Sequence, residues 1–313
     1  MDIAEMISAF EQAGKRVHVI GNPQQGVLVA LDMEARLYTY VRGKVVNQVN
    51  PLAIAGRSTQ TSYLNPGGDG LWPAPEGTCL GYQYATGHWR VPASIRSARY
   101  QVIEAAEHAA TVEAEIDLVN NQAVGIPALF RRFISLEDGS GTLTVQVHES
   151  IVYTGSRLLP ADTFLLAPWT LCQFGCGPGC HVVFPGSDRA SFWDLYEETI
   201  VPACSWESDL WRVPTDGTQR FQIGLGQAVP WIEFHDPSKG LIVRREAGTI
   251  SGNNRYIDIR DADLASKPDP RGVRYSVYAD PGGFMEIEAV GGCPTHLHPG
   301  TELQVSVSTR YHY

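Results

Sequence analysis

Two glutamates near the C-terminal end, Glu286 and Glu288, are spaced so that they could perform acid–base chemistry together. They lie in residues 283–292, Gly-Phe-Met-Glu-Ile-Glu-Ala-Val-Gly-Gly, a pattern typical of a β-strand. Because alternate side chains of a strand share a face, both carboxylates point the same way, flanked by Phe284 and Val290. Two like charges on a partly buried face raise the pKa of one carboxyl group and so favour a general base. The other interpretation is a solvated sheet face on which both glutamates pair with arginines.

A second candidate for chemistry is the segment 64–77, which contains three prolines and four glycines. Proline fixes φ and glycine allows positive φ, so we expect a rigid, shaped loop and no helix. Trp72 would offer an aromatic plane to the CH face of a sugar, and side-chain oxygens of the same segment would accept its hydroxyl hydrogens. The polar side chains concerned are Asn65, Asp69 and Glu76. The alternative is a structural corner in which the tryptophan fills one end of a sandwich.

Histidines and cysteines supply weaker candidates. His88 follows the 64–77 segment closely and is expected to line the same pocket, and His235, at the end of a strand, is a further candidate for substrate binding. Residues 172–181, Cys-Gln-Phe-Gly-Cys-Gly-Pro-Gly-Cys-His, could form a zinc site, but the spacing differs from the usual two-residue knuckle. We therefore expect a glycine-rich turn with free thiols and no metal. No Walker loop, nucleophile elbow or dinucleotide-binding glycine motif is present, so no cofactor is expected.

The composition limits the choice of partners. The 313 residues are 43% hydrophobic, with a net charge of −10 and a pI near 5.4. No basic run exists, which argues against nucleic acid, and no apolar run is long enough to span a membrane. The first residues lack the basic and then apolar layout of a signal peptide, so we expect a cytoplasmic protein.

The elements that position these residues are predicted to be almost entirely strands. One helix is expected at residues 2–14, where Asp2 can cap it and Ile3, Met6 and Phe10 fall on one face. Strict alternation of apolar and polar residues predicts strands at 111–119 and 142–148. Further strands are expected at 16–20, 26–32, 36–41, 220–224, 231–235, 241–245, 274–279, 284–290 and 302–311. Residues 188–200 suit a short helix or a loop. We predict an all-β antiparallel sandwich in which residues 1–313 form a single domain.

Several stretches, in order along residues 16–313, resemble the galactose-mutarotase-like superfamily, which includes the aldose 1-epimerases and an uncharacterised bacterial branch. Residues 31–37, Leu-Asp-Met-Glu-Ala-Arg-Leu, are similar to the family's opening strands, in which an arginine, here Arg36, follows a small residue. Residues 67–76, Gly-Gly-Asp-Gly-Leu-Trp-Pro-Ala-Pro-Glu, resemble a motif of the bacterial relatives. Residues 166–174 resemble the central strand, and residues 286–292 with 298–303 resemble the final strand pair.

The resemblance implies a large antiparallel β-supersandwich that binds sugars on a concave sheet. Mutarotases of the family use a glutamate base near the C-terminal end, which matches Glu288, with Glu286 beside it. They also use a histidine acid on the central strand, and this sequence has Trp169 near that place. The predicted function is therefore an aldose 1-epimerase-like isomerase with a small sugar as partner. The alternatives are a non-catalytic sugar-binding protein on the same fold, and a lyase or hydrolase that acts on an unusual sugar.

Overall fold

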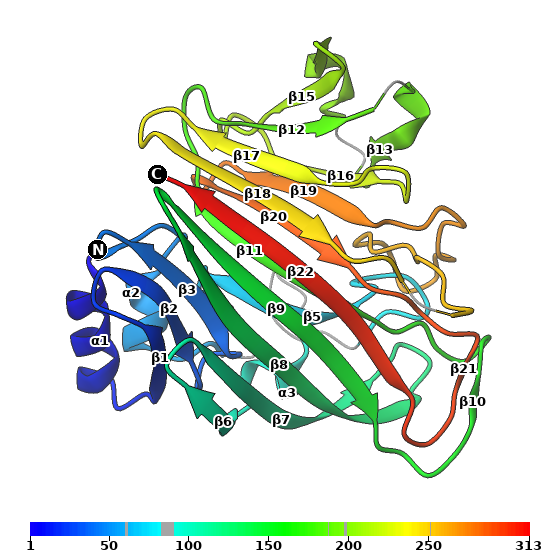
Figure 1. The fold of residues 1–313 in the computed structure, drawn as a ribbon. Helices are drawn as coiled ribbons and strands as arrows, with labels where there is room; N and C mark the ends of the chain where they lie inside the picture. Colours follow the sequence, from blue (N-terminus) through cyan, green and yellow to red (C-terminus); the bar gives the residue numbers. More distant parts are fainter. Residues whose placement is uncertain (60–61, 83–90, 187, 197–198, 251) are drawn as a thin grey trace.

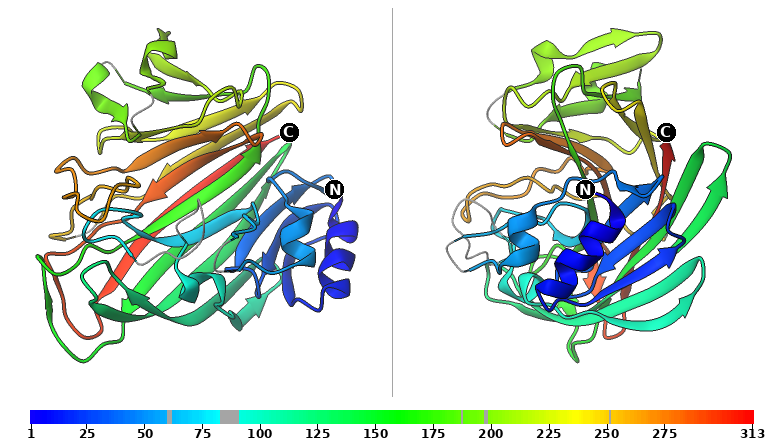
Figure 2. Two further views of the ribbon diagram at one scale, coloured as in Figure 1. Left: turned by 180° about the vertical axis from the view of Figure 1, so that it is seen from behind. Right: turned by 90° about the vertical axis from the view of Figure 1, so that its left-hand side faces the viewer.

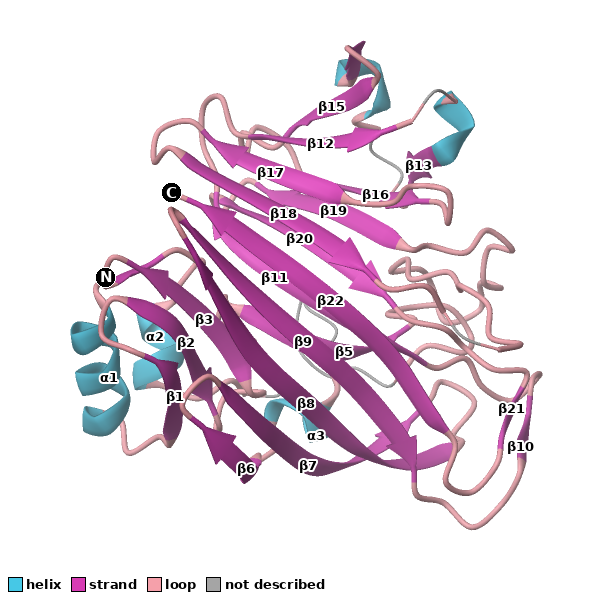
Figure 3. Cartoon of the chain, in the orientation of Figure 1, coloured by secondary structure: helices cyan, strands magenta, loops and turns pink. Residues whose placement is uncertain are grey.

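The computed structural model describes residues 1–313 except 60–61, 83–90, 187, 197–198 and 251. Its described part is mostly antiparallel β-sheet (Figures 1 and 3). This confirms the predicted all-β antiparallel sandwich with a short N-terminal helix. None of the helices described is both long and apolar enough to cross a membrane.

Two large sheets pack face to face. The first sheet, here called the site sheet, runs in the order β1-β2-β3-β5-β11-β20-β19-β16-β13, with β4 beside β3. Its strands are β1 (Val17–Gly21), β2 (Gln25–Ala30), β3 (Arg36–Val41), β4 (Lys44–Val45), β5 (Asp69–Ala74), β11 (Ala167–Gly175), β13 (Phe192–Asp194), β16 (Phe221–Leu225), β19 (Tyr275–Asp280) and β20 (Phe284–Val290).

The second sheet, here called the back sheet, runs in the order β14-β15-β12-β17-β18-β22-β9-β8-β7-β6. Its strands are β6 (Gln101–Ala106), β7 (Ala109–Val119), β8 (Gly125–Gly139), β9 (Thr142–Tyr153), β12 (His181–Pro185), β14 (Ser205–Glu207), β15 (Leu210–Pro214), β17 (Ile232–Asp236), β18 (Leu241–Ala247) and β22 (Glu302–His312). A small separate pair joins β10 (Leu159–Pro160) to β21 (His296–Leu297).

The space between the sheets is filled by alternate side chains of both. Phe174 of β11 stacks on Phe234 of β17 with ring centroids 5.2 Å apart, which shows that this face of β11 points at the back sheet. In β9 the alternating apolar residues Leu143, Val145 and Val147 are all buried. The period-two alternation therefore identifies the faces that form the core.

A second, smaller core lies on the other face of the N-terminal strands. Helix α1 (Ile3–Gln12) begins after Asp2, which caps it as predicted and also forms a capping box with Glu5. The apolar face of α1, with Phe10 at its centre, packs with helix α2 (Pro51–Ala55) against β2 and β3 (Figure 2). These helices occupy the outer face of β1–β3 and leave the outer face of the later strands for other uses. A third short helix, α3 (Ala93–Arg96), precedes β6.

The structure corrects the prediction of a loop at residues 64–77. Asp69–Ala74 form strand β5, which pairs with β11 along its whole length. A strand is possible despite Pro73 because β3 pairs with β5 at only one position, Leu37 opposite Asp69, so the missing amide donor costs no bond on that side. In the segment 188–200, left open above, the described residues form a 3₁₀ turn (Arg189–Ser191) followed by β13. A second 3₁₀ turn (Val201–Ala203) follows.

Candidate active site

The site sheet presents one cluster of polar and aromatic side chains on its outer face. Cys172 and Phe174 of β11 face the back sheet, where both contact Tyr311, so their neighbours in the strand must point outward. The register then aligns outward positions of five strands: Trp72 lies opposite Trp169, Gln173 opposite Glu286, Glu286 opposite Tyr278, and Tyr278 opposite Gln222. Together they line a pocket formed by Trp72, Glu76, Trp169, Leu171, Gln173, Tyr196, Gln222, Tyr278, Glu286 and Glu288.

Glu286 and Glu288 form the centre of this pocket. Both are almost removed from water, with exposed fractions of 4% and 0%, and their carboxyl groups are hydrogen-bonded to each other. Burial, and then the charge of Glu288, raise the pKa of Glu286 well above its ordinary value. A hydrogen bond between two carboxyl groups requires one proton between them. Of the two groups, Glu286 has the pKa that burial and its neighbour raise further, so Glu286 keeps a proton more readily than Glu288.

Neighbouring donors favour the charged form of Glu288. Burial raises the pKa of Glu288, whereas hydrogen bonds from Glu286, Trp169 and Gln222 oppose this rise. Nε1 of Trp169 donates to Oε2 of Glu288 at 3.1 Å, and Nε2 of Gln222 donates to the same oxygen at 3.2 Å. Ser276 lies opposite Glu288 on β19. A buried carboxylate that accepts several directed hydrogen bonds is fixed in position, as a general base must be.

The aromatic wall of the pocket is built on a buried ion pair. The rings of Trp72 and Trp169 meet edge to face, with centroids 6.1 Å apart. Nε1 of Trp72 donates to Oε2 of Glu34 at 3.1 Å, and the guanidinium of Arg36 also donates to this oxygen, at 2.9 Å. Arg36 lies over the Trp72 ring at 5.5 Å and fills the space in which a side chain at Gly70 would clash. Arg36 therefore supports Trp72 and does not itself line the pocket.

The pocket is narrow. The free volume between its side chains is about 20 Å³, close to the room that one water molecule needs. Tyr196, outside the sheet, packs on Tyr278 with ring centroids 6.2 Å apart, and Arg220 donates to both hydroxyl groups. A ligand larger than water therefore requires side chains such as Tyr196 to move.

The structure brings five of the predicted site residues together around this pocket and places Arg36, Asn65, Asp69 and His235 elsewhere. The five are Trp72, Glu76, Trp169, Glu286 and Glu288. Asn65 lies just beyond the pocket, where its Oδ1 accepts a hydrogen bond from Gln173 at 3.0 Å. His88 lies outside the described residues.

Asp69 and His235 are turned away from the pocket. Asp69 points into the space between the sheets, where Oδ2 accepts from Arg245 at 2.8 Å and the same carboxylate pairs with Arg132. His235 lies on β17 of the back sheet, where its ring stacks on His181 at 4.7 Å. Neither side chain can contact a ligand beside Glu288.

Other lining residues were missed from the sequence. Gln222 and Tyr278 alternate with the buried residues of β16 and β19, such as Ile223 and Val277, so their outward direction was readable from the period-two pattern. The pattern does not reveal that β16 pairs with β19 and β19 with β20. Only this pairing brings the two side chains to Glu288.

No candidate metal centre accompanies the pocket. Within the part of the chain that the structure describes, no group of three or more His, Cys, Asp and Glu side chains is placed to hold a metal ion. All six cysteines are free thiols. Cys172 faces the back sheet, where burial raises its pKa to about 12, so its thiol stays protonated.

Comparison with known proteins identifies the fold. No protein-family model matches the sequence, and no curated protein matches it. Among solved structures, a galactose mutarotase-like protein from Lactobacillus casei ATCC 334 superposes with a TM-score of 0.60 at 13% identity, covering 95% of this chain and 100% of that chain. A protein from Escherichia coli K12 that is provisionally named as an aldose 1-epimerase gives a TM-score of 0.57 at 12% identity, covering 96% and 100%.

A third structure extends the same pattern. A galactose mutarotase-like protein from Clostridium acetobutylicum gives a TM-score of 0.51 at 12% identity, covering 95% of this chain and 97% of that chain. Matches of this length at such low identity show a common fold across nearly the whole chain. They do not transfer individual residues or an activity, because one fold can carry several functions.

Proposed function

We propose that this chain, a protein with the galactose mutarotase-like fold, interconverts the two anomers of an aldose, with Glu288 as the general base and Glu286 as the general acid. The observation that supports the proposal is the buried pair of adjacent carboxyl groups in the pocket, of which Glu286 keeps a proton more readily than Glu288. The relatives named as aldose 1-epimerases or galactose mutarotase-like proteins make a free sugar the natural substrate class.

The carboxyl pair can supply the proton acceptor and the proton donor that this reaction needs. Anomer exchange removes a proton from the C1 hydroxyl, breaks the bond between C1 and the ring oxygen, and adds a proton to that oxygen. Both oxygens are bonded to C1, so adjacent acid and base groups can reach them together. Glu288 takes the hydroxyl proton while Glu286 gives its proton to the ring oxygen. Ring closure on the opposite face reverses both transfers, so the pair returns to its starting state.

The surrounding groups match this assignment. Trp169 and Gln222 donate to Glu288 and so stabilise its carboxylate form before the reaction. Trp72 and Trp169 present aromatic surface to the apolar face of a sugar ring. Because the pocket has room for only about one water molecule, sugar binding must displace lining side chains, and Tyr196 lies outside the sheet, where it can move without breaking a strand.

A sugar-binding protein without turnover is the second candidate. The observation in its favour is Trp169, whose indole Nε1 can donate a hydrogen bond but cannot transfer a proton in the way that the histidine of the family's mutarotases does. The two candidates differ in one measurable property. Both bind a sugar, but only the first accelerates anomer exchange above the rate in buffer.

Polarimetry of freshly dissolved aldoses provides the test. Wild-type protein is expected to accelerate the change in optical rotation of at least one sugar of a panel. Glu286→Gln, which keeps the shape but cannot donate a proton as an acid, should lower that rate by about 100-fold. Glu246→Gln, an exposed change on β18, is the matched control and should leave the rate unchanged. Binding of a sugar without any acceleration would exclude the epimerase and leave the binding protein.

A further inference from the structure

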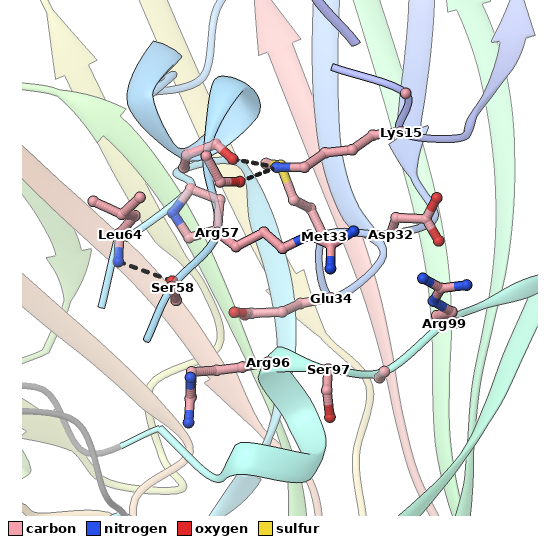
Figure 4. Close-up of a pocket in the computed structure, with 15 residues that line it drawn as sticks. Lys15, Asp32, Met33, Glu34, Arg57, Ser58, Leu64, Arg96, Ser97 and Arg99 are labelled. Atoms are coloured by element: carbon pink, nitrogen blue, oxygen red, sulfur yellow. Dashed lines mark hydrogen bonds between the residues drawn. The ribbon is translucent and has the colours of Figure 1, made fainter. Parts of the chain in front are cut away.

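A second and larger cavity lies near the N-terminal end, on the outer side of β2 and β3. It has a volume of about 280 Å³, near the lower end of the range for small-molecule sites. The turn after α1, the turn between β2 and β3, the segment after α2, and α3 with the residues that follow it form its walls. Its basic side chains are Lys15, Arg57, Arg96 and Arg99 (Figure 4).

The acidic groups in this cavity are already paired with other arginines. Asp32 binds Arg16, with Nη2 2.7 Å from Oδ1, and Glu34 binds Arg36, with Nη2 2.9 Å from Oε2. Neither Arg16 nor Arg36 lines the cavity. Among the described residues, the four basic side chains that line it form no ion pair, and they outnumber the two acidic ones, so the cavity carries an excess of positive charge.

The basic side chains keep donors that no acceptor occupies. Lys15 uses two of its protons on the carbonyl oxygens of Ala53 and Gly56, at 2.5 and 2.6 Å. Arg57 and Arg99 have no hydrogen-bond or ion-pair acceptor among the residues described. Figure 4 shows the Arg57 side chain extending toward the turn that carries Asp32 and Glu34. Arg96 donates to the carbonyl oxygen of Thr59, yet its Nε is buried without a partner.

We propose that this cavity binds a small phosphate-bearing anion, held by Arg57 and Arg99 with Lys15 and Arg96 around it. Guanidinium groups match the oxygens of phosphate through paired hydrogen bonds, and a lysine adds a point charge. Ser58 and Ser97 add hydroxyl donors to the walls. The closeness of the positive charges agrees with this assignment. Burial, and then the charge of Arg57, lower the pKa of Lys15, and an anion between Lys15 and Arg57 would relieve their repulsion.

The cavity also touches the candidate active site through one residue. Glu34 lines the cavity and accepts the hydrogen bond of Trp72, which forms the wall of the Glu288 pocket. The charge of an anion in the cavity would act on the Glu34 carboxylate, which holds Trp72. The site is therefore placed to influence Trp72, although its existence does not depend on the reaction at Glu288.

Titration calorimetry with inorganic phosphate, at constant ionic strength set with sodium chloride, tests the proposal. Wild-type protein is expected to bind one phosphate per chain. The double variant Arg57→Gln/Arg99→Gln should lose affinity by about tenfold or more, because two charge-assisted contacts are removed. The matched control is Arg310→Gln on β22, an arginine that is exposed in the same way on the other sheet. All substitutions are on exposed side chains, so the fold should persist.

A second ligand, glycerol 3-phosphate, distinguishes an organic phosphate ester from free inorganic phosphate as the ligand of the cavity. Tighter binding than inorganic phosphate supports an organic phosphate as the ligand, and equal binding supports the free ion; both support the site. The proposal fails if wild-type protein binds neither ligand saturably. It also fails if the double variant binds as well as wild type, or if Arg310→Gln weakens binding by the same factor, because the interaction is then general charge attraction.

Discussion

Replacing Glu288 by glutamine is the sharpest test of the chemistry at the carboxyl pair. The amide can put its oxygen where Oε2 now accepts from Trp169 and Gln222, at 3.1 and 3.2 Å, so those two hydrogen bonds can be kept. The variant also removes a negative charge from a fully buried position. We therefore expect it to fold at least as well as wild type, while losing the group that takes the proton from the sugar.

The expected loss follows from the role of the group. Removing a general base costs about 100-fold or more in turnover, which corresponds to about 2.7 kcal/mol in activation free energy. Sugar affinity should change much less, because the hydrogen-bonding surface is preserved. Exchange between the anomers can be followed by NMR saturation transfer at equilibrium, and binding by titration calorimetry with the same sugar. The expected signature is a lower maximal rate at nearly constant affinity.

Two outcomes would refute this reasoning. The first is that Glu288→Gln and wild type turn over the same sugar at the same rate. The base would then lie elsewhere, and the carboxyl pair would be structural. If the variant loses turnover only because it has lost its fold, the near-ultraviolet dichroism of its buried tryptophans will have changed. The control Glu246→Gln, on the surface of β18, should match wild type in every measurement.

Three further outcomes are expected. Because the pKa of Glu286 is raised from 4.5, the folded state holds a proton that the unfolded state releases, so its contribution to stability is lost as pH rises above 4.5. Urea unfolding should show the wild type losing up to about 1.4 kcal/mol per pH unit relative to Glu286→Gln over part of this range; parallel pH profiles would contradict the assignment. Trp72→Ala should weaken sugar binding by about tenfold in calorimetry, equal to ~1.4 kcal/mol, and unchanged affinity would move the binding surface elsewhere. Asp69→Asn should lower the free energy of unfolding by about 3–5 kcal/mol, because Arg132 and Arg245 lose a buried partner; a loss below about 1 kcal/mol would show that this carboxylate is dispensable.

The faces of the strands could be predicted from the sequence because side-chain direction is a local property. In β20 the alternation placed Glu286 and Glu288 on one face and Met285 and Ile287 on the other, and the structure has the latter pair buried in the core. The resemblance to the galactose-mutarotase-like superfamily likewise predicted the fold correctly. The first conclusion depends on a pattern within one short stretch of sequence, and the second depends on the order of several such stretches.

The destination of Asp69 could not be predicted in the same way. Glycine and proline interrupt the alternation in residues 64–77, so no periodic pattern marked β5 as a strand or distinguished its two faces. The partners of Asp69 are 63 and 176 residues away along the chain, and only the packing of the two sheets brings them to it. His235 was misjudged for a related reason, because a strand end does not reveal which sheet the strand joins.

The alternation of side chains in the site sheet determines which mutations the pocket tolerates. Residues that face the pocket, such as Leu171, Gln173 and Gln222, alternate along their strands with residues that point toward the core. A substitution at an outward position can thus alter ligand choice while the core stays intact. A deletion of a single residue within a strand would instead exchange its two faces. In β20 this would turn the carboxyl pair toward the apolar layer, and in β11 it would do the same to Trp169 and Gln173. The pocket should accordingly tolerate many substitutions but no change of length in these strands.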